Sequence, residues 1–253
     1  MNKKILGVGA LIVIALGVLG FALVNKEEVE TLKVGTEGTY APFTFHDETG
    51  KLTGFDVEIA EEVARRMGVE IEFIETKWDG MFAGLDSKRF DMVANQVGIR
   101  ADREEKYDFS IPYIQSRAVL IVSDTNTEIN SFTDLNGKKA GQSLTSNYGK
   151  MAQDNGAELV AVDGFNQSIE LLNSGRIDAT INDSLSYLDY KKQKPDAAIK
   201  IVATEDEASQ SGLLFRKGNE DLVEKVNAAL EAMIQDGTFE EISVKWFGED
   251  VLE

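Results

Sequence analysis

Short strand patterns alternate with amphipathic helix patterns along most of this chain, and this alternation constrains its fold more than any other feature. Residues 56–67 place apolar side chains at helical spacing, with Asp56 as a capping residue and Gly68 as a stop. Residues 69–73 then alternate apolar and acidic side chains, which predicts a half-buried strand. Because the same order recurs further along, the chain is predicted to be an α/β protein.

Two series of such elements are predicted, one on each side of a central segment. The first has strands near 32–34, 69–73 and 91–95 and helices over 56–67 and 78–87. The second has strands near 139–141, 159–162, 179–182 and 199–202 and helices over 146–155, 167–174 and 184–192. The carboxyl-terminal segment is predicted to be helical because Leu222, Val226, Leu230 and Ile234 are spaced by four.

Residues 85–95 resemble residues 172–182 without a gap: Leu, Ser, Arg, Asp and Asn agree in order. One interpretation is chance similarity of a common helix–turn–strand unit, and the other is a chain of two similar lobes. In the second case Asn95 and Asn182 end matching strands. Ligands of open α/β sheets bind beyond the carboxyl ends of strands, so the residues that follow, Gln96 and Asp183, would line a cleft.

The amino terminus carries an apolar run, residues 5–24, which contains no charged side chain and follows Lys3 and Lys4. A signal peptide has an apolar core of about 7–15 residues, whereas a membrane-spanning helix needs about 20. We therefore expect residues 1–24 to be a cleaved signal peptide or a retained membrane anchor, with a buried core helix as the remaining alternative. Residues 25–30 would form a polar linker, and the rest would be exported.

Composition excludes several function classes. The 253 residues carry 26 cationic and 44 anionic side chains, a net charge of −18, which disfavours nucleic acid as a partner. Cysteine is absent and His46 is the single histidine, so the sequence offers no thiolate site and no histidine pair for zinc. No metal or other cofactor is expected.

The loop after the first predicted strand, residues 35–45, combines two glycines and Pro42 with aromatic and acidic side chains. At the carboxyl end of a strand, Glu37, Tyr40 and Phe43 are well placed to hold a small molecule. The alternative is a packed turn whose aromatic side chains belong to the core.

Four stretches of the sequence resemble a known family, in the same order and at the same spacing. They are residues 35–43, residues 54–60, Arg103 with residues 107–113, and residues 175–179 with 182–183. The family is the extracytoplasmic solute-binding proteins of polar amino-acid ABC transporters, known as bacterial solute-binding protein family 3. The resemblance runs from about residue 30 to the end of the chain.

This resemblance implies a type II periplasmic-binding-protein fold of two α/β lobes joined by two hinge strands. Lobe 1 would comprise residues 31–115 and 213–253, and lobe 2 residues 116–212. The ligand would be a free amino acid, whose two charges need opposite charges and directed donors when they are buried.

By the same resemblance, Arg103 would bind the ligand carboxylate, because its planar guanidinium can donate two parallel hydrogen bonds. Asp183 would receive the ammonium. Alternatives remain for both: Arg103 could be an exposed residue paired with a neighbouring acid, and Asp183 could cap the helix that starts at Ser184.

Further ligand contacts are implied around these two charges. Gly98 would let its backbone N–H approach the ligand closely, and a helix start at Thr145, Ser146 and Asn147 would favour the same carboxylate. Either hydroxyl could equally be an ordinary helix cap. An aromatic box would surround the carbon skeleton, although two of its members, Phe55 and Trp78, could equally be core residues. The box consists of Tyr40, Phe55 and Trp78.

The side-chain pocket would be formed by Asn95 and Gln96 with residues 143–148 and 209–211, a combination that resembles cystine-binding members of the family. Amides and hydroxyls suit a long, uncharged, polar ligand. An acidic Glu37 could hold a second ammonium, as in cystine, lysine or arginine. L-cystine is therefore the predicted ligand, with arginine, lysine or glutamine as alternatives.

Three classes of function are compatible with this reading. The first, which we predict, is a monomeric binding protein that closes on its ligand and delivers it to a membrane permease outside the cytoplasm, in the periplasm or at the cell surface. The second is a dehydratase on the same scaffold, which needs a general acid such as Glu37 or Asp183. The third is a sensory ligand-binding module. We predict that the chain is not an enzyme.

Overall fold

The structure is a computed structural model that describes residues 30–252. The segment predicted as a signal peptide or anchor, 1–24, and nearly all of the predicted linker, 25–30, lie outside the described residues. Within residues 30–252, no helix combines the length and the apolar character that crossing a membrane requires.

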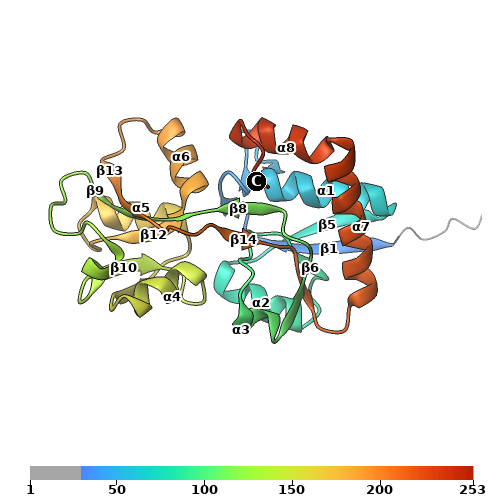
Figure 1. Cartoon of the computed structure of the whole chain (residues 1–253), viewed down its shortest axis with the longest axis horizontal. Coiled ribbons are helices and arrows are strands. Elements are labelled where there is room, and N and C mark those ends of the chain that lie inside the picture. The colour runs from blue at the N-terminus through green and yellow to red at the C-terminus, as the bar shows by residue number, and fades with distance from the viewer. Residues whose placement is uncertain (1–29, 253) are drawn as a thin grey trace, which may run out of the picture.

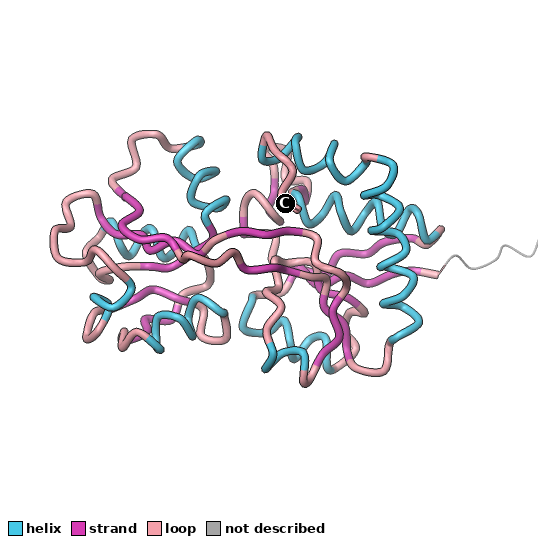
Figure 2. Tube along the Cα trace, viewed as in Figure 1, coloured by secondary structure: helices cyan, strands magenta, loops and turns pink. Residues whose placement is uncertain are grey.

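Two lobes lie side by side and are joined by two extended segments that run between them (Figure 1). These segments contain strands β8 (Ile114–Ser116) and β14 (Ser209–Ser211), which pair antiparallel with Gln115 opposite Gln210. Figure 2 shows both of them crossing from one group of helices to the other. The predicted two-lobe α/β fold with two hinge strands is confirmed.

Lobe 1 is built on a mixed sheet in the order β5–β1–β6–β15–β7. Strand β1 runs parallel to β5 and β6, whereas β15 runs antiparallel to β6 and β7. The carboxyl ends of β1 and β6 therefore meet at one edge, which faces lobe 2. The bounds are β1 Thr31–Thr36, β5 Glu70–Glu75, β6 Met92–Val93, β7 Tyr107–Phe109 and β15 Leu214–Arg216. A small antiparallel sheet contains β2 Thr39–Tyr40, β3 Thr44–His46 and β4 Leu52–Thr53.

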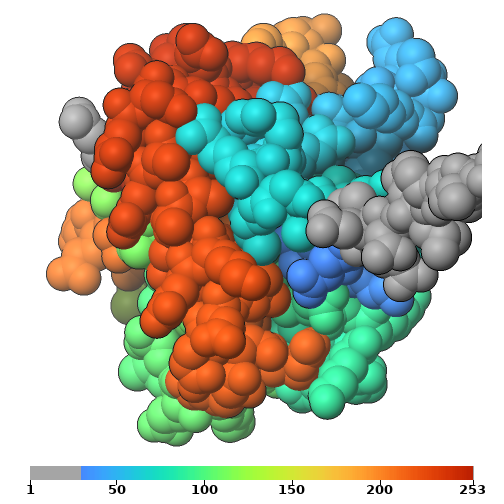
Figure 3. Space-filling model, turned by 90° about the vertical axis from the view of Figure 1, so that its right-hand side faces the viewer, coloured from blue at the N-terminus to red at the C-terminus, as the bar shows by residue number. Residues whose placement is uncertain are grey.

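Helices cover both faces of this sheet. One apolar cluster joins Ile59 of α1 and Leu230 of α7 to the sheet, and α8 adds Phe239 to it. A second cluster packs Met81 and Leu85 of α2 against the other face. In Figure 3 the orange and red residues of α7 and α8 lie beside the cyan residues of α1. The carboxyl-terminal segment thus completes the lobe that the amino-terminal segment begins. The bounds are α1 Phe55–Met67, α2 Trp78–Asp86, α3 Ala101–Glu104, α7 Glu220–Asp236 and α8 Thr238–Phe247.

Lobe 2 is centred on strand β9, which the sequence analysis did not identify. Its side chains alternate between two apolar clusters: Leu120 and Val122 pack with Ala152 of α4, whereas Val119 and Ile121 pack with the α5 side. A strand buried on both faces has no polar alternation, and this is why its pattern was missed. The strands form the groups β12–β9–β13 and β10–β11. The bounds are β9 Ala118–Ser123, β10 Lys139–Gln142, β11 Glu158–Ala161, β12 Thr180–Asp183, β13 Ile199–Thr204, α4 Asn147–Asp154, α5 Phe165–Asn173 and α6 Ser184–Gln193, with a 3-10 turn at Phe132–Leu135.

Candidate functional site

A cavity lies between the two lobes and has about 530 Å³ of empty space, its open mouth included. Lobe 1 contributes the residues that follow β1 and β6 and the start of α2. Lobe 2 contributes the segment between β10 and α4, the start of α5 and the end of β12. Strand ends and helix starts are where α/β proteins hold small ligands, because both leave backbone groups and short polar side chains pointing outward.

Seven residues of the predicted site line this cavity. They come from both lobes, and they include both the amide expected at the end of β6 and the helix start expected near residue 146. They are Glu37, Tyr40, Trp78, Asn95, Gln96, Ser146 and Asn147.

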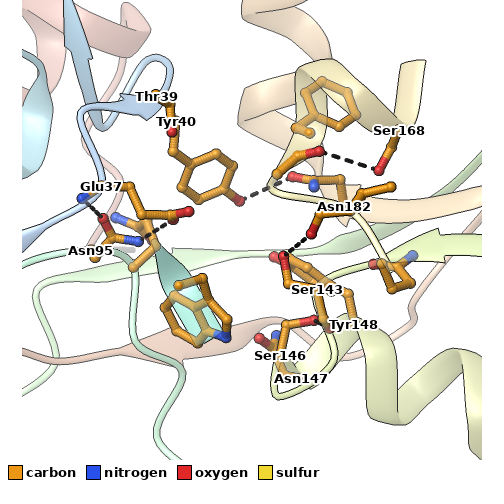
Figure 4. A pocket seen from close by; sticks show the side chains of 16 residues that line it. Glu37, Thr39, Tyr40, Asn95, Ser143, Ser146, Asn147, Tyr148, Ser168 and Asn182 are labelled. Carbon is orange, nitrogen blue, oxygen red and sulfur yellow. Dashed lines mark hydrogen bonds between the residues drawn. The ribbon is translucent and has the colours of Figure 1, made fainter. Parts of the chain in front are cut away.

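The Glu37 and Asn95 side chains are held together at the edge of the lobe 1 sheet (Figure 4). The Glu37 backbone N–H donates to Asn95 Oδ1 over 2.7 Å, and Asn95 Nδ2 donates to Glu37 Oε2 over 2.6 Å. Burial raises the pKa of Glu37 to about 7, and the nearby Asp79 and Asp163 add to this increase. Glu37 can therefore be a hydrogen-bond donor or a carboxylate near neutral pH.

Tyr40 connects the lobes across the cavity. Its hydroxyl donates to Asn182 Oδ1 over 3.0 Å, and Figure 4 shows the ring extending from the lobe 1 loop toward Asn182. Burial raises the pKa of Tyr40 well above its usual value, so the hydroxyl stays protonated. Asn95 and Asn182, the matching residues of the two similar segments, thus lie on opposite sides of one cavity.

Arg103 is 4 % exposed and lies next to the cavity rather than in its lining. Its guanidinium carbon is 5.5 Å from the ring centre of Trp78, and Trp78 lines the cavity. Its Nη1 donates to the Gly98 carbonyl over 3.0 Å and its Nη2 to the Thr145 carbonyl over 3.4 Å. Burial lowers the pKa of Arg103 to about 10. Within residues 30–252 this buried cation forms no ion pair, so it retains N–H groups for an anion.

Asp183 is also buried beside the cavity, and its neighbour Asn182 is the residue that lines it. The carboxylate accepts from Ser116 Oγ in a hinge strand, from Tyr148 Oη over 3.2 Å and from the Leu185 N–H over 2.8 Å. The bond to Leu185 caps α6, so the alternative role considered for Asp183 is present. Burial raises the pKa of Asp183 to about 6.

The residues at the start of α4 have two different roles. Ser146 caps the helix, because its Oγ accepts from the Gly149 N–H over 2.9 Å, and with Asn147 it lines the cavity. Thr145 is exposed outside the cavity, where its hydroxyl donates to Asp79 Oδ1 of lobe 1 over 2.8 Å.

The structure does not bring Phe55 and Gly98 into the cavity lining. Phe55 is fully buried in the lobe 1 core, where its ring stacks on Tyr113 with centroids 6.0 Å apart. The alternative reading of Phe55 as a core residue is the one that the structure shows. Gly98 forms an antiparallel β-bridge with Ser211 of β14, and its carbonyl accepts a hydrogen bond from Arg103.

Sequence reasoning missed part of the lobe 2 wall. Phe165 and Ser168, which lie at the start of α5, were not expected, whereas Ser143 and Tyr148 belong to the segment 143–148 that was expected in the pocket. The signal available for α5 was Gly164, which precedes the helix with a φ of 127° and marks a strand-to-helix turn. Within residues 30–252, no group of three or more acidic or histidine side chains is arranged to hold a metal ion.

A sequence model of the bacterial extracellular solute-binding proteins, family 3, matches residues 32–249, which span both lobes and both hinge strands. The chain belongs to this family. The resemblance predicted from four short stretches is therefore confirmed, and the family is one of extracellular proteins. A relative of this solute-binding protein, the L-cystine-binding protein TcyA of Bacillus subtilis strain 168, is 51% identical over 232 residues, covering 91% of this chain and 85% of TcyA.

Two solved structures superpose on this solute-binding protein to different extents. An ancestral arginine-binding protein bound to arginine is 41% identical, with a TM-score of 0.81 and coverage of 86% and 98% of the two chains. The L-cystine solute receptor of Neisseria gonorrhoeae, unliganded and open, is 49% identical, yet its TM-score is 0.58 over 88% and 95% of the chains. The more similar sequence superposes less well. The lobe arrangement here is therefore nearer to the ligand-bound protein than to the open one.

Proposed function

We propose that this protein binds a polar amino acid outside the cytoplasm by closing its two lobes, and delivers it to the permease of an ABC importer. L-cystine is the best candidate. The observation that carries the proposal is the cavity at the lobe interface, lined by amides, hydroxyls and aromatic rings, with a buried guanidinium, Arg103, and a buried carboxylate, Asp183, beside it. A free amino acid carries the two opposite charges that such groups would compensate.

In this mechanism the ligand carboxylate binds the unused N–H groups of Arg103 and the start of α4. The ligand ammonium binds Asp183, whose carboxylate already accepts from neutral donors and gains most from a cation. Tyr40 and Trp78 pack on the carbon skeleton between them. Because these groups belong to both lobes, a ligand that contacts all of them stabilises the closed form.

The residues that line the cavity support a ligand with a long, uncharged, polar side chain. Gln96, Gln142 and Ser168 offer amides and a hydroxyl, and Glu37 offers a carboxyl group for a second ammonium, as in cystine. The 51% sequence identity between this chain and the L-cystine-binding protein TcyA supports the same choice of ligand. A basic amino acid is the second candidate, because Glu37, Asp79 and Asp163 together favour a cationic side chain.

We propose further that the protein is not an enzyme, that it acts as a monomer, and that it resides in the periplasm or at the cell surface. The two carboxyl groups that a dehydratase could use, Glu37 and Asp183, are both held in hydrogen bonds that suit ligand binding. We propose that the lobes divide at 115/116, within β8, and at 212/213, just after β14.

A thermal-shift screen of the twenty amino acids and L-cystine on ligand-stripped protein tests this function. A ligand at 100 times its dissociation constant stabilises the folded state by about 2.7 kcal/mol, an easily measured rise in Tm. We expect the largest rise with L-cystine. A larger rise with arginine or lysine would replace cystine by the second candidate, and no rise with any of them would reject amino-acid binding.

A further inference from the structure

Asp56 is a fully buried carboxylate that has no helix-capping role. The sequence predicts that it caps α1, but this is wrong: the helix starts one residue earlier, at Phe55, with Gly54 as its cap residue and no side-chain capping bond. Asp56 instead accepts three hydrogen bonds from residues far along the chain. Its donors are the Gln96 N–H over 2.8 Å, Gln96 Nε2 over 2.9 Å and Tyr113 Oη over 3.0 Å.

These bonds fix both the backbone and the side chain of Gln96. Its φ is 52°, in the left-handed region that is unfavourable for a residue with a side chain, and the bond to its N–H helps to hold it there. A carboxylate can only accept hydrogen bonds, so the amide nitrogen of Gln96 must face Asp56. The amide oxygen must then point elsewhere.

That oxygen is left without a partner. Gln96 Oε1 is buried and makes no hydrogen bond within residues 30–252, while Gln96 itself is 8 % exposed and lines the cavity. A buried acceptor without a donor is unfavourable. A ligand in the cavity that carries an N–H or O–H group could supply the donor.

We propose that Asp56 is a positioning residue, which orients the Gln96 amide so that its oxygen accepts a hydrogen bond from the bound ligand. The inference rests on the proposed function, because the ligand is the amino acid of that site. Burial raises the pKa of Asp56 to about 7, and a protonated Asp56 could donate to the amide oxygen and allow the opposite orientation. The proposed orientation of the Gln96 amide thus depends on Asp56 being in its ionised form.

A double-mutant cycle tests this role by calorimetric titration with L-cystine and, in parallel, with L-arginine. Asp56→Asn presents a donor where the carboxylate accepted, so we expect its dissociation constant to rise about tenfold. In the Gln96→Ala background, the same substitution should change the dissociation constant less than twofold. If Asp56→Asn weakened ligand binding equally in the wild-type and Gln96→Ala backgrounds, or in neither of them, the proposal would be overturned.

Tyr113→Phe is the matched control, because it removes a bond to the same carboxylate and leaves both bonds between Asp56 and Gln96 in place. We expect its dissociation constant to stay within threefold of wild type, whatever change in Tm it causes. An effect as large as that of Asp56→Asn would mean that general loosening of the core, not the Gln96 amide, controls binding.

A ligand-free measurement separates this inference from the proposed function. If the wild-type protein binds neither ligand, the choice of ligand in the proposed function fails, and the amide is then followed by ¹⁵N NMR on its own. The Gln96 NH₂ signals, assigned by their absence in Gln96→Ala, should exchange slowly with water in wild type and rapidly in Asp56→Asn. Rapid exchange of the Gln96 NH₂ protons with water in the wild-type protein would contradict the proposal that Asp56 orients this amide.

Discussion

The Asp79 carboxylate of lobe 1 accepts two hydrogen bonds from Thr145 of lobe 2, one from its hydroxyl over 2.8 Å and one from its backbone N–H over 3.0 Å. The neighbouring Leu144 N–H donates to the same carboxylate over 3.2 Å. Lys77 pairs with Asp163 over 2.6 Å nearby. These contacts join the two lobes outside the cavity lining, so they stabilise the present arrangement of the lobes.

We therefore expect Asp79→Asn to shift the protein toward the open form. Loss of charge-assisted bonds at an exposed site is worth roughly 1 kcal/mol, which corresponds to about a fivefold rise in the dissociation constant. Small-angle scattering of the ligand-free variant should show a larger radius of gyration. Asp154→Asn is the control, because among the described residues Asp154 bonds only to Lys150 of its own helix. An unchanged scattering profile and affinity in Asp79→Asn would contradict the role of this contact.

Arg103→Met should abolish ligand binding and leave the fold intact. Breaking a buried ion pair with a ligand carboxylate costs about 3–5 kcal/mol, so the dissociation constant should rise at least 100-fold. Replacing an unpaired buried cation with an apolar side chain of similar length should keep the Tm of the ligand-free protein within a few degrees. Arg100→Met is the control, because Arg100 pairs with Asp102 near the surface. Wild-type affinity in Arg103→Met, measured by calorimetry, would remove Arg103 from the site.

Ligand affinity should fall in acid. Burial raises the pKa of Asp183 to about 6, and an ammonium binds its ionised form, so protonation of Asp183 competes with the ligand. The dissociation constant should rise below this pKa by up to about tenfold per pH unit. Glu37→Gln should keep this rise, because the pKa of Glu37 is about 7 and its protonation acts at higher pH. A dissociation constant that is the same at pH 5 and pH 7.5 would exclude a charged Asp183 as the ammonium receptor.

Gly54 should tolerate no side chain. Its φ is 130°, and a Cβ placed there would lie 2.1 Å from the Phe43 carbonyl oxygen. Gly54→Ala is expected to lower the free energy of unfolding by about 3 kcal/mol or more, in urea titrations. Gly50→Ala is the matched comparison. The φ of Gly50 is 82°, but no atom of residues 30–252 lies within 4 Å of the added carbon, so we expect the free energy of unfolding to fall by about 1 kcal/mol. Similar losses in both variants would show that backbone conformation, and not the close approach to Phe43, sets the cost.

The two-lobe architecture could be predicted from the sequence. So could the sheet edge at which the cavity lies, which is the carboxyl ends of the strands. Asn95 and Asn182 could be placed because helix and strand periodicities locate strand ends, and two similar segments imply two similar ends. Aromatic side chains were harder to place. Phe55 precedes Ile59 and Val63 by four and eight positions, so it shares their buried face once the helix starts at Phe55.

Contacts between distant segments gave no local signal. The bonds from Gln96 to Asp56 join residues 40 positions apart, and those from Thr145 to Asp79 join residues 66 apart. Such pairs depend on how the lobes pack, which periodicity does not encode. The same limit explains why Arg103 and Asp183 could be expected to lie near one cavity while their present partners, backbone carbonyls and neutral hydroxyls, could not be foreseen.

A crystal structure of the protein grown with L-cystine tests the central claim most directly. We predict closed lobes with the ligand in the cavity, one carboxylate within hydrogen-bond distance of the Arg103 guanidinium and the ammonium of the same half within hydrogen-bond distance of Asp183. Ligand density that contacts neither side chain, with Arg103 still bonded to the Gly98 and Thr145 carbonyls, would contradict it.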